Sequence, residues 1–199
     1  MNNCKIVGTN HLQSKESIIK EITDYQPDII CIELCKIREY IYLNKIEQKQ
    51  DEKDESLLGK ISQAIKKKAT EEKVEYGSDM YTALQYAIDN KIPYVLVDKN
   101  IQEIQQLFQK IPSNEQQGFI KELNIFEKQT IAESTVDEKE FLNKLKTNFP
   151  ISYEILITLR EQEIALNILK TMLNNPNKKI IVFVGKGHIN GINKLCLLL

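Results

Sequence analysis

Ile180-Ile181-Val182-Phe183-Val184, followed by Gly185-Lys186-Gly187-His188, is the stretch that decides the fold of this chain. An uninterrupted apolar run that ends at a glycine is typical of a short strand covered on both faces of a sheet. Three similar apolar runs occupy residues 4–7, 29–33 and 94–98. The sequence therefore predicts four short, buried strands.

Helical patterns separate the predicted strands. Met80, Ala83, Leu84 and Ala87, for example, recur at the spacing of one buried helix face. Short buried strands that alternate with helices predict an α/β fold, in which a central, mainly parallel sheet is flanked by helices.

The chain between the last two predicted strands has a helical pattern throughout, over residues 101–111, 115–134, 137–148 and 151–174. We therefore expect a helical insertion of approximately residues 101–174 between these strands, large enough to form a lid. A second, strongly polar stretch with helical spacing covers residues 45–73. No internal repeat is present and 199 residues suit a single domain, so we assign residues 1–199 to one domain.

Composition and charge exclude several classes of protein. The formal net charge of −1 gives no basic surface for nucleic acid or an anionic membrane. No apolar run approaches the ~20 residues that span a bilayer, and the first residues lack the layout of a signal peptide. We expect a soluble, cytoplasmic protein without a transmembrane segment. The four cysteines include no Cys-x-x-Cys pair and are expected to be buried, reduced thiols.

Histidine occurs only twice, and both copies end the pattern Gly-x-x-His, as Gly8-Thr9-Asn10-His11 and Gly185-Lys186-Gly187-His188. Each pattern follows a predicted strand, and ligands of open parallel sheets bind beyond the carboxyl ends of the strands. Imidazole is suited to metal ligation and to proton transfer. Gly8 and Gly185 are able to adopt unusual φ angles there, so that backbone N–H groups face an anion. The pattern predicts one site assembled from both ends of the sequence.

Glu33 and Asp98 end the other two predicted strands. Two imidazoles and two carboxylates at one sheet edge would form a metal site or an acid/base cluster. Each carboxylate also has a structural alternative. Glu33 could lie in water or pair with Arg38, and Asp98 could cap the helix that begins near Ile101.

Arg160 projects from an apolar helix face, since Ile157, Ile164 and Ile168 lie at positions i−3, i+4 and i+8 from it. A guanidinium in that position requires an anionic partner, either a carboxylate of the site or a group of the substrate. The alternative is an exposed arginine whose stem covers apolar surface.

Taken in order, these motifs resemble the TraB/PrgY family, which is related to the Tiki metalloproteases and more distantly to the erythromycin-esterase and ChaN-like proteins. The resemblance spans nearly the whole chain. The matching stretches are residues 8–11, 26–35 with Arg38, 77–80 with Ala83, 95–98, 149–150 with Arg160, and 184–192.

The resemblance implies an α/β fold with helical insertions, and a site built from the paired Gly-x-x-His motifs, a glutamate and an arginine. It implies that His11 and His188 are metal ligands and that Glu33 is a ligand or a base. Arg38 would be their electrostatic partner. The further pocket candidates are Gly8, Asp79, Asp98, Gly185 and Gly187.

In the Tiki branch such a site supports divalent-metal-dependent peptide hydrolysis, and the TraB branch is associated with shutting down peptide pheromone signalling. The first hypothesis is therefore a hydrolase of a peptide or small-molecule substrate that uses zinc, manganese or cobalt. Arg38 or Arg160 would stabilise the negative charge that develops in its reaction.

The alternative hypothesis is a non-catalytic peptide-binding or regulatory protein. Leu159 favours it, because the family commonly has a glutamate at this position, and Lys99 likewise replaces a common arginine. A third hypothesis, by analogy with the ChaN-like relatives, is that the histidines bind a heme-like ligand.

Overall fold

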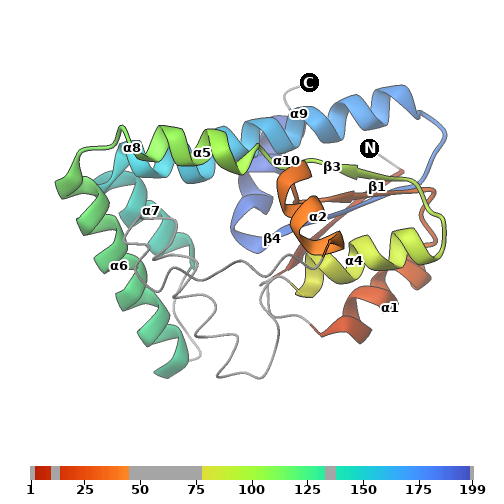
Figure 1. Ribbon diagram of the computed structural model, residues 1–199, viewed down its shortest axis with the longest axis horizontal. Helices are drawn as coiled ribbons and strands as arrows, with labels where there is room; N and C mark the ends of the chain where they lie inside the picture. Colours follow the sequence, from red (N-terminus) through yellow and green to blue (C-terminus); the bar gives the residue numbers. More distant parts are fainter. Residues whose placement is uncertain (1–2, 10–13, 45–77, 133–137, 198–199) are drawn as a thin grey trace.

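The computed structural model describes residues 3–9, 14–44, 78–132 and 138–197 of the chain (Figure 1). The helical stretch expected at residues 45–73 and the first predicted metal ligand, His11, lie outside the described residues.

The described residues form one four-stranded sheet in which every strand pair is parallel. Its strands are β1 (Cys4–Thr9), β2 (Ile29–Ile32), β3 (Tyr94–Leu96) and β4 (Ile180–Gly185), and their spatial order is β1-β4-β2-β3. The last strand therefore lies between the first two. The predictions of four strands and of an α/β fold with a parallel sheet are confirmed.

Helices cover both faces of the sheet, which makes three layers (Figure 1). One face packs against α1 (Lys15–Tyr25) and α4 (Ser78–Asp89), and the other against α9 (Leu159–Asn174) and α10 (Ile189–Leu197). A short helix, α2 (Lys36–Leu43), follows β2.

Strand β4 shows why the apolar runs are continuous. Ile181 and Phe183 pack in the core against α1 and α4, whereas Ile180, Val182 and Val184 pack in the core against α9 and α10. Successive residues of a strand point to opposite faces, and here both faces are covered. An alternation of apolar and polar residues would therefore bury polar groups.

The described residues between β3 and β4 are mainly helical, as expected, and part of them has a core of its own. Ile104, Phe108, Phe119, Leu145 and Ile155 form that core, away from the sheet. The helices are α5 (Ile101–Phe108), α6 (Ser113–Ala132), α7 (Glu138–Asn148) and α8 (Pro150–Tyr153), followed by a π-helical turn, η1 (Glu154–Thr158), that leads into α9. Across the described ranges, no helix is long and apolar enough to cross a membrane.

The four cysteines are free thiols, as predicted. Cys31, Cys35 and Cys196 are buried, and Cys4 is half-buried at the start of β1. Burial raises the pKa of the Cys4 thiol to about 11 and that of the Cys31 thiol to about 12. Because only the thiolate is nucleophilic, both thiols should react slowly.

We expect Cys4 and Cys31 to resist alkylation by iodoacetamide at pH 8 in the folded protein. With a pKa of about 11, roughly one Cys4 thiol in a thousand is ionised at that pH. Peptide mapping by mass spectrometry after a timed pulse measures the reaction, and the unfolded protein in guanidinium is the control. Equal labelling of both thiols in the folded and unfolded protein would contradict this expectation.

Candidate functional site

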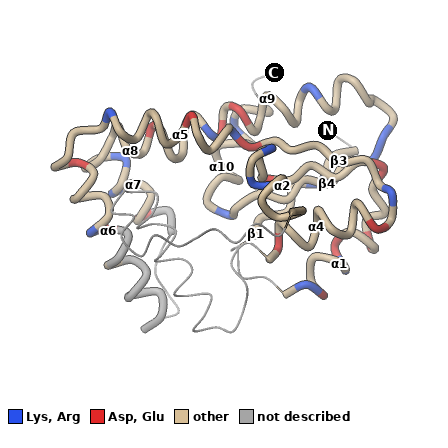
Figure 2. Tube along the Cα trace, in the orientation of Figure 1, with Lys and Arg blue, Asp and Glu red and all other residues tan. Residues whose placement is uncertain are grey.

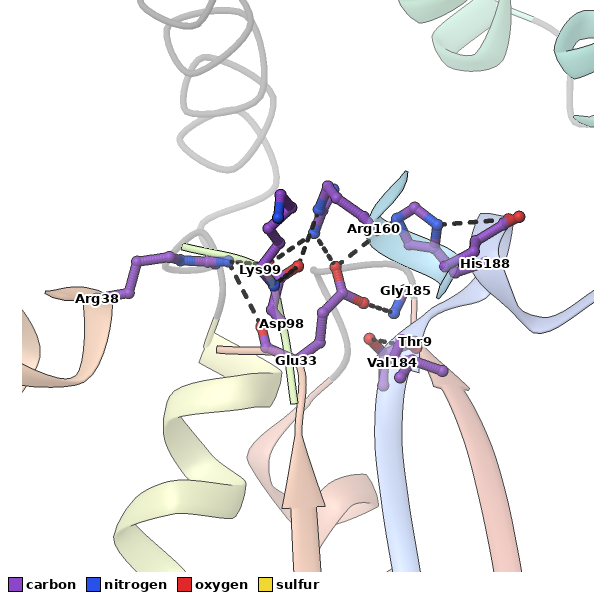
Figure 3. A network of polar contacts seen from close by, with 10 residues as sticks. Thr9, Glu33, Arg38, Asp98, Lys99, Arg160, Val184, Gly185 and His188 are labelled. Atoms are coloured by element: carbon purple, nitrogen blue, oxygen red, sulfur yellow. Dashed lines mark hydrogen bonds and ion pairs between the residues drawn. The ribbon is translucent and has the colours of Figure 1, made fainter. Parts of the chain in front are cut away.

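The carboxyl ends of the strands bring together charged side chains that are distant in the sequence (Figure 3). Glu33 directly follows β2, Asp98 lies two residues after β3, and His188 ends a short 3-10 turn, η2 (Lys186–His188), after β4. Arg160 reaches the same edge from the first turn of α9. Along the other described elements, acidic and basic residues are interspersed (Figure 2).

Glu33 is almost completely buried, with 2% of its surface exposed. Its Oε2 accepts a hydrogen bond from the Gly185 N–H at 2.5 Å, and its Oε1 pairs with Nη2 of Arg160 at 2.5 Å. The Glu33 N–H donates to the Phe183 carbonyl at 3.0 Å, which extends the pairing of β2 with β4 beyond the strand end. Glu33 therefore does not lie in water.

Asp98 receives a two-pronged contact from Arg160. Nε donates to Oδ1 at 3.0 Å and Nη2 donates to Oδ2 at 2.9 Å, the geometry in which a guanidinium binds a carboxylate most specifically. The backbone holds Asp98 in place, because its N–H donates to the Leu34 carbonyl at 3.2 Å. The prediction that Arg160 has an anionic partner is confirmed, with one guanidinium bridging two buried carboxylates.

The alternative role of Asp98 as a helix cap is wrong. The side chain of Asn100 caps α5, accepting a hydrogen bond from the Gln102 N–H at 2.9 Å. Arg38 lies beside Asp98, with Nη1 at 3.5 Å from Oδ2, and also donates to the Glu33 backbone carbonyl at 3.4 Å. Arg38 thus joins the cluster at its outer side, where the guanidinium is part-exposed.

His188 lies between two carboxylates. Its Nε2 is 3.8 Å from Oε1 of Glu33, and its Nδ1 is 3.6 Å from Oε1 of Glu161. The ring is buried, and Nδ1 has no hydrogen-bond partner. Glu161 was not among the predicted site residues. Its position directly after Arg160, on the helix that supplies the cluster, is the signal that could have found it.

The expected glycine geometry is wrong at Gly185. This residue has φ −57° and ψ 136°, which any amino acid adopts, and its N–H faces the protein's own Glu33 carboxylate rather than an external anion. Gly8 lies inside β1 rather than beyond it. A Cβ at Gly8 would approach Cδ1 of Ile189 to 2.1 Å, so close packing against α10 explains this glycine.

Two other pocket candidates have structural positions. Asp79 is fully buried in the first turn of α4, where its Oδ1 accepts a hydrogen bond from the Met80 N–H at 2.8 Å. Gly187 is the middle residue of η2. Because His11 lies outside the described residues, the convergence of the two histidines stays a prediction.

Of the three predicted metal ligands, the structure describes two, His188 and Glu33. Among the described residues, no group of three histidine, cysteine, aspartate or glutamate side chains is placed to hold a metal ion. The donor atoms of the two predicted ligands, His188 Nε2 and Glu33 Oε1, lie 3.8 Å apart. Donor atoms that share one ion lie roughly 3–4 Å apart, since each is about 2 Å from the metal. His11, the third predicted ligand, lies outside the described residues.

A groove of about 480 Å³ lies between α5 and α9, and none of the cluster side chains Glu33, Asp98, Arg160 and His188 lines it. Lys99 and Leu159, next to Asp98 and Arg160 in the sequence, both line it, together with Leu107 and Leu166. Lys99 forms an ion pair with Glu103 at 2.8 Å, and this hydrogen bond raises the pKa of Lys99. Lys99 and Leu159 therefore both face the groove.

No protein-family model matches this chain, and no curated protein matches it. The class of this protein is therefore described from its fold and its site alone. It is a parallel α/β protein whose strand ends enclose a buried carboxylate–arginine cluster with a histidine beside it.

Proposed function

We propose that this protein is a metal-dependent hydrolase of peptide-like substrates that resembles the Tiki branch of the TraB/PrgY family. The observation that supports this proposal is the approach of a buried imidazole to a buried carboxylate, His188 Nε2 to Glu33 Oε1, at the carboxyl edge of a parallel sheet. That edge is where open α/β sheets bind their ligands.

His188 and Glu33 would hold a divalent ion, with His11 as the third ligand expected from the sequence. Zinc, manganese and cobalt all accept nitrogen and oxygen donors. Such an ion lowers the pKa of a bound water molecule and polarises a carbonyl group.

The side chains around this pair have separate roles. Arg160 and the Gly185 N–H fix both oxygens of the Glu33 carboxylate, which orients it toward His188. Arg38, at the outer side of Asp98, would supply a positive charge to stabilise the negative charge that develops on a substrate carbonyl. The groove beside Leu159 and Lys99 would accommodate the peptide.

A non-catalytic peptide-binding protein is the second candidate. The observation in its favour is that Arg160 and the Gly185 N–H already bind both oxygens of Glu33. These contacts neutralise the negative charge of Glu33 that would otherwise attract a metal cation. Under this second proposal, the groove would bind a peptide without cleaving it.

Metal binding by the full chain, purified without a histidine tag, tests the proposal. We expect the protein to bind one divalent ion of zinc, manganese or cobalt, measured by isothermal titration calorimetry. His188→Ala should weaken this binding at least about tenfold, because it removes one ligand. The exposed Asn193→Ala, on the neighbouring helix α10, is the control and should bind as the wild type does.

Cleavage separates the two candidates. Incubation of the metal-loaded protein with a peptide library, read by mass spectrometry, should yield products that are absent with His188→Ala. If the wild type binds none of the three metals at micromolar concentration, the metal-dependent hydrolase is excluded. If it binds metal and peptide but produces no cleavage, the binding protein is the correct assignment.

A further inference from the structure

His188 Nδ1 is an unusual atom in this fold. Only two other buried side-chain polar atoms among the described residues, Ser78 Oγ and Ser152 Oγ, also have no hydrogen-bond partner. Nδ1 faces Oε1 of Glu161 at 3.6 Å, slightly beyond hydrogen-bond length. A small rotation of either side chain would close this distance.

The chain makes room for the Glu161 carboxylate at a specific position of α10. A Cβ at Gly191 would lie 1.9 Å from Oε2 of Glu161 and 2.2 Å from its Cδ. Any side chain larger than hydrogen would therefore displace this carboxylate. Glu161 itself is buried, with 9% of its surface exposed. Helices α9 and α10 are thus shaped to keep a carboxylate beside Nδ1.

The position of the ring proton follows from these surroundings. A neutral imidazole has one N–H and one lone pair. If the proton were on Nε2, the lone pair of Nδ1 would be buried, without a donor, against the negative charge of Glu161. With the proton on Nδ1, Glu161 accepts a hydrogen bond, and the lone pair of Nε2 faces Glu33, whose negative charge Arg160 and the Gly185 N–H already compensate.

We propose that Glu161 is a positioning residue, which accepts a hydrogen bond from Nδ1–H of His188 and so holds Nε2 as the free, ligand-binding nitrogen. A metal-binding histidine generally has such a partner on its second nitrogen, which fixes the tautomer and the ring orientation. The statement about metal binding rests on the proposed function. The statement about the tautomer does not.

Nitrogen-15 NMR of the imidazole rings, at about pH 8.5, distinguishes the two tautomers. With only two histidines in the chain, His11→Ala assigns both sets of signals. We expect the Nδ1–H tautomer for His188 in the wild type. Glu161→Gln should give a mixture of tautomers, because an amide both donates and accepts, and Gly191→Ala should do the same by displacing Glu161.

Two variants on the same helices serve as controls. Glu163→Gln, also on α9 but lining the groove, and the exposed Asn193→Ala on α10 should keep the wild-type tautomer. An Nε2–H or doubly protonated His188 ring in the wild type would overturn the inference. The same conclusion would follow if the Nδ1–H tautomer remained unchanged in Glu161→Gln.

Zinc titration of the same proteins gives a readout that is independent of activity. We expect Glu161→Gln and Gly191→Ala to bind zinc about 10–100 times more weakly than the wild type. If the wild type binds no metal, the proposed function fails, and the tautomer still decides the role of Glu161. If the wild type binds zinc and Glu161→Gln binds it equally well, the positioning role fails alone.

Discussion

Replacing Arg160 with methionine is expected to destabilise the protein by about 3–5 kcal/mol, the range observed when one partner of a buried ion pair is removed. The guanidinium of Arg160 contacts Glu33 at 2.5 Å and Asp98 at 2.9 Å, and both carboxylates are nearly inaccessible to water. Methionine fills much of the same volume without the charge. Two buried carboxylates would then lose their main counter-charge.

Urea unfolding followed by circular dichroism measures this loss of stability. Lys20→Met is the matched control, because the ion pair of Lys20 with Asp24 is exposed, and such pairs contribute only about 0–1 kcal/mol. Adding Glu33→Gln and Asp98→Asn to Arg160→Met should restore part of the lost stability. A loss below about 1 kcal/mol in Arg160→Met would show that the carboxylates do not depend on this arginine.

Phe183→Ala is the second substitution with a large expected effect, about 3–5 kcal/mol of destabilisation. Phe183 has no exposed surface and lies in the middle of β4, where it packs against residues of α1 and α4. Removing the ring leaves a cavity under the central strand, and the rigid sheet cannot collapse to fill it.

The same unfolding experiment tests this substitution. Leu173→Ala on α9 is the control, since 80% of Leu173 is exposed and its truncation should change stability by less than about 0.5 kcal/mol. A loss below about 1 kcal/mol for Phe183→Ala would contradict the packing of β4 described above.

The local patterns of the sequence predict the fold well. The strands and the helices between them follow from apolar periodicity, and the parallel sheet follows from their alternation. The spatial order of the strands could not be predicted, because apolar runs of similar composition fit any position in the sheet. Nothing in the sequence of β4 requires it to separate β1 from β2.

The site illustrates what a single sequence leaves open. Strand ends identified Glu33, Asp98 and His188, and the apolar face around Arg160 predicted its anionic partner. The sequence left open whether Asp98 caps α5, and the structure gives that role to Asn100, the residue directly before the helix. The position of Glu161 directly after Arg160 points to the site, but its contact with His188 depends on the crossing of α9 and α10 at Gly191, which no local pattern predicts.

The central place of β4 has a consequence for how the protein is made. The ribosome completes β1 and β2 long before β4, yet in the sheet these two strands are not paired with each other, and each of them pairs with β4. Loop closure between such distant segments is slow and comes late. Until β4 inserts, Glu33 has no Gly185 N–H to bind. We therefore expect the nascent chain to remain without a formed site until β4 has been made.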